Sequence, residues 1–67
     1  MKIPRLYLDP SVIGGYFDPE FAAVTKRLFA DLALGRYRGV ISDLVARELL
    51  RAPEEVRALV EANADID

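Results

Sequence analysis

The sequence predicts an α/β fold with a short parallel sheet, and three observations support this prediction. Two β-prone apolar segments lie far apart in the chain, at residues 5–9 and 37–41. Each leads into segments with helix-start signals and helical periodicity. The 67 residues of the chain suffice for one small domain only. Two strands joined through helices form a βαβ unit, in which the strands are parallel and the crossover is right-handed.

The first expected strand covers residues 5–9, which are apolar without clear alternation, as in a strand buried on both faces. It ends at Asp9, because a residue that precedes proline is held in the extended region. The proline that follows suits the first position of a helix. We therefore expect a short helix over residues 10–16.

The next helix begins at the signal Asp18-Pro19-Glu20 and runs to about Leu34, where Gly35 ends it. Apolar residues recur along it at helical spacing, and charged residues lie off this stripe. The expected inward stripe contains Phe21, Val24, Thr25, Leu28, Phe29 and Leu32. We interpret its aromatic residues as core.

The second expected strand covers residues 37–41 and is followed by Ser42, a good N-cap for a helix over about 43–51. A further helix, started by a proline, covers about 53–63. We expect no third strand in the closing residues 64–67.

The composition limits the chemistry that this chain can carry. It has no Cys and no His, which excludes the usual zinc sites and every His-based triad. A metal would need oxygen ligands, which favours Mg²⁺ or Mn²⁺. The net charge of −2 gives no basic field of the kind that binds nucleic acids.

No signal peptide or membrane span is expected, so we predict a cytoplasmic protein without membrane contact.

Two acids define the candidate site. Asp9 ends the first strand and Ser42 ends the second, and parallel strands end at one edge, where open α/β sheets bind ligands. Glu48 follows within two turns and, at 100° per residue, lies inside the apolar stripe of its helix. Two carboxylates with the hydroxyls of Ser11 and Ser42 nearby suit a divalent cation.

Structural explanations of the same residues stay open at this point. Asp9 and Ser42 are each explained as helix N-caps. A carboxylate on a buried face is costly unless it has a partner. Glu48 therefore lies at the rim of a cleft that holds a cation, pairs with an arginine, or belongs to a helix that is rotated toward solvent.

Two motifs carry a family resemblance: residues 7–13 (Tyr-Leu-Asp-Pro-Ser-Val-Ile) and residues 41–49 (Ile-Ser-Asp-Leu-Val-Ala-Arg-Glu-Leu). In this order and separation they resemble the PIN-domain family, notably VapC-like toxins. Members of that family open with a strand ending in Asp, and return with a strand ending in Ser or Thr before a helix that carries Glu-Leu. Pro10 stands where the family usually has a small polar residue.

The resemblance implies a PIN-like β-α-α-β-α-α unit and a Mg²⁺- or Mn²⁺-dependent endoribonuclease that acts on RNA. It implies Asp9 and Glu48 as catalytic metal ligands, with Ser11 and Ser42 in support. It further implies an antitoxin-like protein partner. Family members add aspartates from a later helix and strand, so residues 1–67 resemble the N-terminal half of the domain and the C-terminal half is absent. We do not assign those later roles to the two aspartates that close the chain.

Two hypotheses from different functional classes follow. The first is a truncated PIN-like nuclease, for which the family resemblance implies the role of toxin in a toxin–antitoxin pair. The alternative is a catalytically inactive PIN fragment that acts only as a protein-binding module or remnant. A weaker third hypothesis is a small α/β module that binds a phosphate ligand without cleaving it. Because a short parallel sheet leaves strand edges and helix faces uncovered, we also predict a homo-oligomer.

Overall fold

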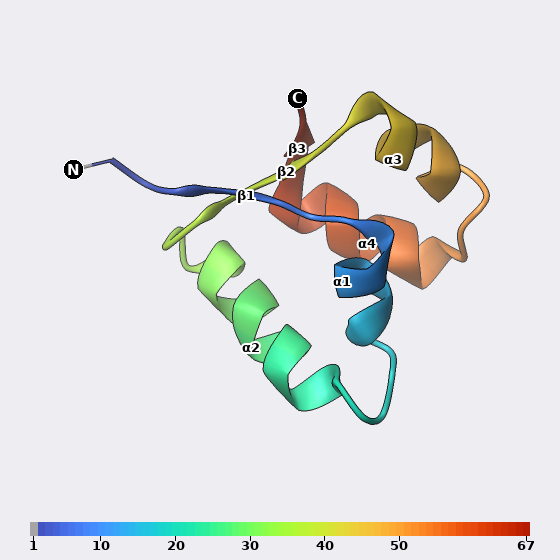
Figure 1. Cartoon of the computed structure of the whole chain (residues 1–67), viewed down its shortest axis with the longest axis horizontal. Helices are drawn as coiled ribbons and strands as arrows, with labels where there is room; N and C mark the ends of the chain where they lie inside the picture. The colour runs from blue at the N-terminus through green and yellow to red at the C-terminus, as the bar shows by residue number, and fades with distance from the viewer. Residues whose placement is uncertain (1) are drawn as a thin grey trace.

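The structure is a computed structural model that describes residues 2–67, and this part of the chain forms a three-stranded parallel sheet with four helices. In chain order the elements are β1 (Arg5–Tyr7), α1 (Pro10–Gly15), α2 (Ala22–Ala33), β2 (Arg38–Ile41), α3 (Asp43–Leu49), α4 (Glu54–Asn63) and β3 (Ala64–Ile66). Helices α1, α2 and α4 contact one another on one side of the strands, and α3 follows the end of β2 (Figure 1). The predicted α/β class with parallel strands is confirmed.

The sheet has the order β1-β2-β3, and both of its strand pairs are parallel. Val40 in the central strand lies between Tyr7 of β1 and Asp65 of β3. The ladder continues one residue further on each side, since the Leu8 amide donates to the Val40 carbonyl oxygen at 2.8 Å and the Asp67 amide donates to that of Ile41 at 2.9 Å. All three strands therefore end at the same edge of the sheet.

Strand β3 corrects the expectation that residues 64–67 form no strand. The chain leaves α4 at Asn63 and turns extended at Ala64, with φ −144° and ψ 154°. The alternation Ala-Asp-Ile-Asp has the period of a strand, but three residues are too few to indicate one without a partner. The partner is β2, where Gly39 has no side chain to obstruct the start of β3.

The first strand is not buried on both faces as expected. Arg5 and Tyr7 are exposed, while Leu8 is buried in the core against the helices. Successive side chains alternate between the faces of a sheet, and in this structure the helices pack on one face. Val40 pairs with Tyr7 and lies on the face opposite the helices, yet its side chain is only 1% exposed. The hydroxyl of Tyr7 donates to the carboxylate of Asp67 at 2.9 Å, which joins the two outer strands across the central one.

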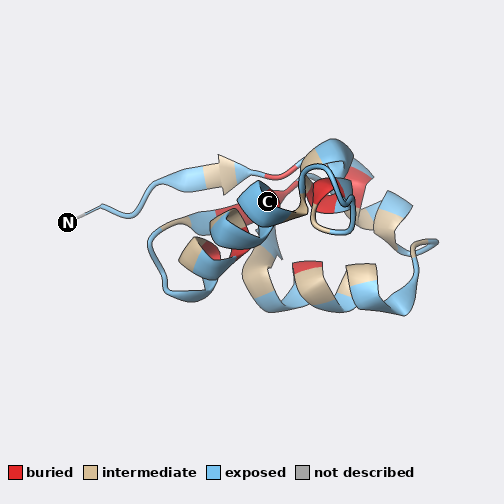
Figure 2. Ribbon diagram, turned by 90° about the horizontal axis from the view of Figure 1, so that it is seen from below, coloured by how far each residue is buried: buried red, intermediate tan, exposed pale blue. Residues whose placement is uncertain are grey.

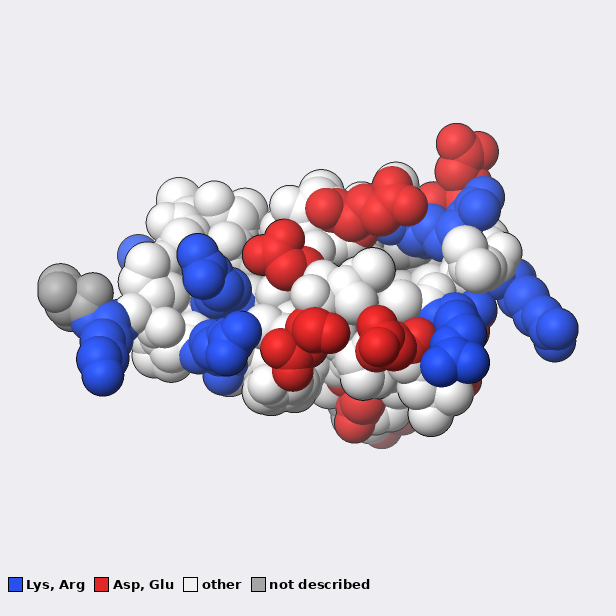
Figure 3. All heavy atoms as spheres, turned by 90° about the horizontal axis from the view of Figure 1, so that it is seen from above, with Lys and Arg blue, Asp and Glu red and all other residues white. Residues whose placement is uncertain are grey.

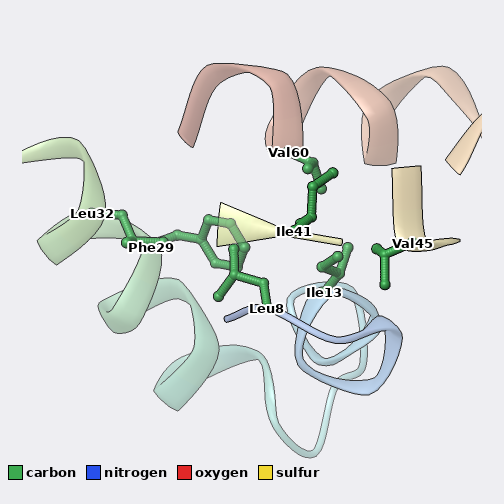
Figure 4. Packing of buried hydrophobic residues seen from close by; sticks show 7 residues of the cluster. All are labelled: Leu8, Ile13, Phe29, Leu32, Ile41, Val45 and Val60. Carbon is green, nitrogen blue, oxygen red and sulfur yellow. The ribbon is translucent and has the colours of Figure 1, made fainter. Parts of the chain in front are cut away.

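The hydrophobic core lies between the sheet and the helices (Figure 2). In Figure 4, Val60 of α4 reaches toward Ile41 of β2. The cluster consists of Leu8, Ile13, Phe29, Leu32, Ile41, Val45 and Val60.

The stripe predicted for α2 is too wide. Thr25, Phe29 and Leu32 are buried as expected, but Phe21 is 54% exposed and Val24 is 76% exposed. The buried residues follow one row at i, i+4 and i+7. A sheet of three short strands covers only that row, so the flanks of the helix face solvent.

Candidate functional site

Asp9 directly follows the β1 ladder and is the N-cap of α1, with extended backbone angles φ −101° and ψ 169°. Its Oδ1 accepts a hydrogen bond from the Val12 amide at 2.9 Å and another from the Ser11 hydroxyl at 2.7 Å. The N-cap explanation of Asp9 is therefore correct. Both hydrogen bonds end on Oδ1, so the cap leaves Oδ2 of this exposed carboxylate open to a cation.

The hydrogen bonds also set the charge of this group. The Ser11 hydroxyl first, and then the Val12 amide, hold the pKa of the Asp9 carboxyl below its usual value, because each donates to the ionised form. Asp9 is thus a carboxylate at neutral pH. Ser11 fixes one oxygen of the Asp9 carboxylate through this hydrogen bond.

Ser42 follows β2 in the same way that Asp9 follows β1. It is the N-cap of α3, and its Oγ accepts a hydrogen bond from the Val45 amide at 3.2 Å. Ser42 thereby fixes the start of the helix that carries Glu48. Among the side-chain hydrogen bonds formed within residues 2–67, none joins Ser42 to Asp9.

Glu48 lies at the edge of the apolar side of α3 rather than within it. The buried side of this helix is centred on Val45 and Leu49, while Leu44 is 63% exposed. The helix is thus rotated from the expected orientation, and Glu48 is exposed. The ion pairs formed within residues 2–67 do not involve Glu48, so the arginine explanation finds no support there.

A hollow of about 260 Å³ joins α1 to α3. Pro10, the neighbour of Asp9, lines one side of it, and Glu48 lines the other side at the rim. Glu48 therefore lines this hollow, whereas Asp9 precedes a lining residue and is not itself part of the lining. Mg²⁺ commonly takes one or two carboxylates and keeps several waters, so Asp9 and Glu48 suit such an ion by the chemistry of their side chains.

The described part of the chain gathers no group of three or more acidic side chains suited to a metal ion. A cation at this place would therefore depend on two carboxylates from these residues. Figure 3 shows acidic side chains in the middle of one face and basic side chains at both of its ends, so no continuous basic stripe crosses that face.

The sequence prediction missed that Asp67 follows a third strand at the same edge as Asp9 and Ser42. Its carboxylate belongs to a different cluster, because it accepts from the Tyr7 hydroxyl and lies 3.7 Å from the guanidinium of Arg5. The hydrogen bond to Asp67 and its negative charge raise the pKa of Tyr7. The alternation in the last four residues is the signal that could have indicated this strand.

A scan against protein-family models, a search of curated proteins and a search of solved structures each found no match to this chain. Within residues 2–67, no helix is long and apolar enough to cross a membrane.

Proposed function

We propose that the chain is a PIN-like, metal-dependent endoribonuclease unit in which Asp9 and Glu48 hold Mg²⁺ or Mn²⁺. The observation that carries this proposal is the Asp9 carboxylate at the carboxyl edge of the sheet. It is ionised, it is fixed through one oxygen, and its other oxygen is open. The two sequence motifs supply the reaction class, through their resemblance to PIN-domain nucleases.

In this proposed site, some residues orient the two carboxylates and the carboxylates themselves supply the negative charge. Ser11 and the N-terminal turn of α1 hold the Asp9 carboxylate in place, and Ser42 fixes the start of the helix that presents Glu48. Asp9 and Glu48 supply negative charge. A bound divalent cation polarises a phosphodiester and lowers the pKa of an attacking water.

The test is Mn²⁺-dependent cleavage of a fluorophore-labelled single-stranded RNA by the wild type and by Asp9→Asn. Asparagine is also a good N-cap, so this substitution removes the charge while the helix start is kept. Asp18→Asn is a matched control, because Asp18 is another exposed aspartate that precedes a proline and accepts a backbone amide, from Glu20 at 2.9 Å. We expect cleavage by the wild type and by Asp18→Asn only. Equal cleavage by the wild type and Asp9→Asn would end the nuclease proposal.

A second candidate function is protein binding without catalysis, and an apolar groove favours it. The groove has a volume of about 490 Å³ and lies between α3, α4 and the outer edge of β3. Leu50 and Ile66 line it and are 72% and 61% exposed. We propose that a second copy of the chain or an antitoxin-like protein covers it, since exposed apolar patches beside a free strand edge favour association.

Sedimentation of the wild type and of Leu50→Asp tests the homo-oligomer in this second candidate. We expect the wild type to sediment as an oligomer and Leu50→Asp as a monomer, because a charge at the groove opposes its burial. A wild type that is monomeric and unfolds cooperatively would contradict self-association.

A further inference from the structure

The two edges of the sheet are free and carry opposite charges. The order β1-β2-β3 leaves one side of β1 and one side of β3 without a neighbouring strand within residues 2–67. Each free side presents backbone N–H and C=O groups that can pair with another chain. Arg5 belongs to β1 and Asp65 to β3, and both side chains are exposed. The sheet therefore has a basic edge and an acidic edge.

Arg5 and Asp65 lie on the same face of the sheet. Tyr7, Val40 and Asp65 are aligned across the three strands, and Arg5 precedes Tyr7 by two residues, which is the side-chain period of a strand. Arg5 approaches only Asp67, at 3.7 Å and in an exposed position, where an ion pair stabilises little. The side chain of Asp65 forms no hydrogen bond or ion pair within residues 2–67. Its carboxylate can therefore pair with a cation on a neighbouring strand.

The apolar groove between α3, α4 and β3 runs along the free edge of β3. Leu50 and Ile66 line it and are exposed, and Ile66 lies on the helix side of the sheet, because it pairs with the core residue Ile41. Arg57 also lines the groove, and its Nε is a buried nitrogen without a hydrogen-bond partner within residues 2–67. Such a donor is costly, which favours an occupant that brings an acceptor. A strand added to β3 would cover this groove on one face of the sheet and lie beside Asp65 on the other.

Charge decides which strand of a second copy fits this edge. Two copies joined through β3 about a two-fold axis would pair antiparallel, so Asp65 of one copy would face Asp65 or Asp67 of the other. Like charges directly opposite each other destabilise a strand pair. The free edge of β1 brings Arg5 to Asp65 instead, and opposite charges at such positions stabilise the pair.

We propose that β1 of a second copy pairs with the free edge of β3, with Arg5 of that copy beside Asp65. The copies then lie side by side in one orientation, and their sheets become continuous. Every added copy leaves a new β3 edge free, so the contact is heterologous and forms a ring or an open series rather than a two-fold dimer. The inference rests on the protein-binding candidate under the proposed function, because it names the strand that covers the groove.

Sedimentation velocity over a range of protein concentrations tests this arrangement. We expect the wild type to form species larger than a dimer as the concentration rises. Arg5→Asp should weaken the association about 2- to 30-fold, because an attractive pair becomes a repulsive pair of similar size. Arg27→Asp is a matched control, since Arg27 is an exposed arginine of α2 and lies on neither strand edge. It should assemble like the wild type.

A mixture of two variants identifies the pair of residues at the contact. Asp65→Arg alone should weaken association as Arg5→Asp does. A 1:1 mixture of Arg5→Asp and Asp65→Arg should assemble like the wild type, because every contact between the two variants joins an acid to an arginine. Restored assembly would also show that both variants are folded.

Hydrogen exchange locates the contact along the backbone. The amides of Leu8 and Asp67 donate to β2, so those of the neighbouring residues Tyr7 and Ile66 point to the free edges. Exchange at Tyr7 and Ile66 should slow as the protein assembles, and it should stay fast in Arg5→Asp at the same concentration.

An Arg5→Asp variant that assembles like the wild type would overturn the inference, and so would a wild type that stops at a dimer. In both results the groove would still be a contact between copies, so the protein-binding candidate would stand. A wild type that is monomeric at every concentration would overturn both. Absence of RNA cleavage would count against the nuclease alone, because neither Arg5 nor Asp65 belongs to the candidate metal site.

Discussion

The packing of β3 against β2 predicts that Gly39→Ala destabilises the fold. A Cβ at Gly39 would lie 2.5 Å from the Asn63 carbonyl oxygen and 3.3 Å from the Ala64 Cβ. The closest atom belongs to the backbone and cannot move aside as a side chain can. The end of α4 and the start of β3 must therefore shift away from the central strand.

The magnitude follows from two opposing effects. Overpacking of this kind costs about 1–3 kcal/mol, and the lower conformational freedom of alanine in the unfolded chain returns about 0.5–1 kcal/mol. We expect a net destabilisation of about 1 kcal/mol, from the difference between the midpoints of these ranges. Gly14→Ala is the matched control, because a Cβ there meets no atom within 4 Å and the residue lies in α1. It should stabilise the fold by about 0.5–1 kcal/mol.

Urea unfolding followed by circular dichroism measures both effects, since the chain has no Trp for a fluorescence signal. Gly39→Ala should lower the midpoint of unfolding and Gly14→Ala should raise it, with the slopes unchanged. A Gly39→Ala variant as stable as the wild type, or more stable, would refute the close packing of β3 against β2.

Three further predictions follow from single contacts. Ser11→Ala should raise the pKa of Asp9 toward its ordinary value, as followed by NMR titration of the carboxyl carbon, because the main donor to the ionised form is lost. In the wild type, the stability contributed by Asp9 is complete above the ordinary pKa of an aspartate and is lost as the pH falls through the lowered pKa. A free energy of unfolding that rises on acidification through this range would contradict the prediction. Asp67→Asn should lower the pKa of Tyr7, measured by ultraviolet titration of tyrosinate, and an unchanged value would show that the two side chains do not meet. Val60→Ala should cost about 2 kcal/mol in urea unfolding, because Val60 is 2% exposed in the core and loses about two methylene equivalents of burial; a cost near zero would place it outside the core.

Signals that lie within a few residues of each other in the chain predicted most of the local structure. One failed, because α2 does not begin at Asp18-Pro19-Glu20 but at Ala22, and its N-cap Phe21 makes no side-chain hydrogen bond. A proline after Asp9 and a serine after β2 fixed where two strands end and two helices begin, and both N-caps form as expected. Strand β3 was missed because it depends on pairing with β2 and on the absence of a side chain at Gly39. Both are contacts between residues far apart in the sequence.

The orientation of helices was predicted less well than their position. The spacing of apolar residues cannot show how wide a face the rest of the fold will cover. Leu44 and Phe21 are exposed for this reason, and Glu48 lies at the edge of its apolar stripe rather than within it.

The most direct test of the candidate site is where Mn²⁺ binds. Substoichiometric Mn²⁺ broadens the NMR signals of nuclei close to it, so a titration of the isotope-labelled protein locates the ion. We predict selective broadening at Asp9, Ser11 and Glu48 together, and its loss in Asp9→Asn. Broadening confined to the acidic end of the chain at Asp65 and Asp67, or broadening that persists in Asp9→Asn, would contradict a metal site formed by Asp9 and Glu48.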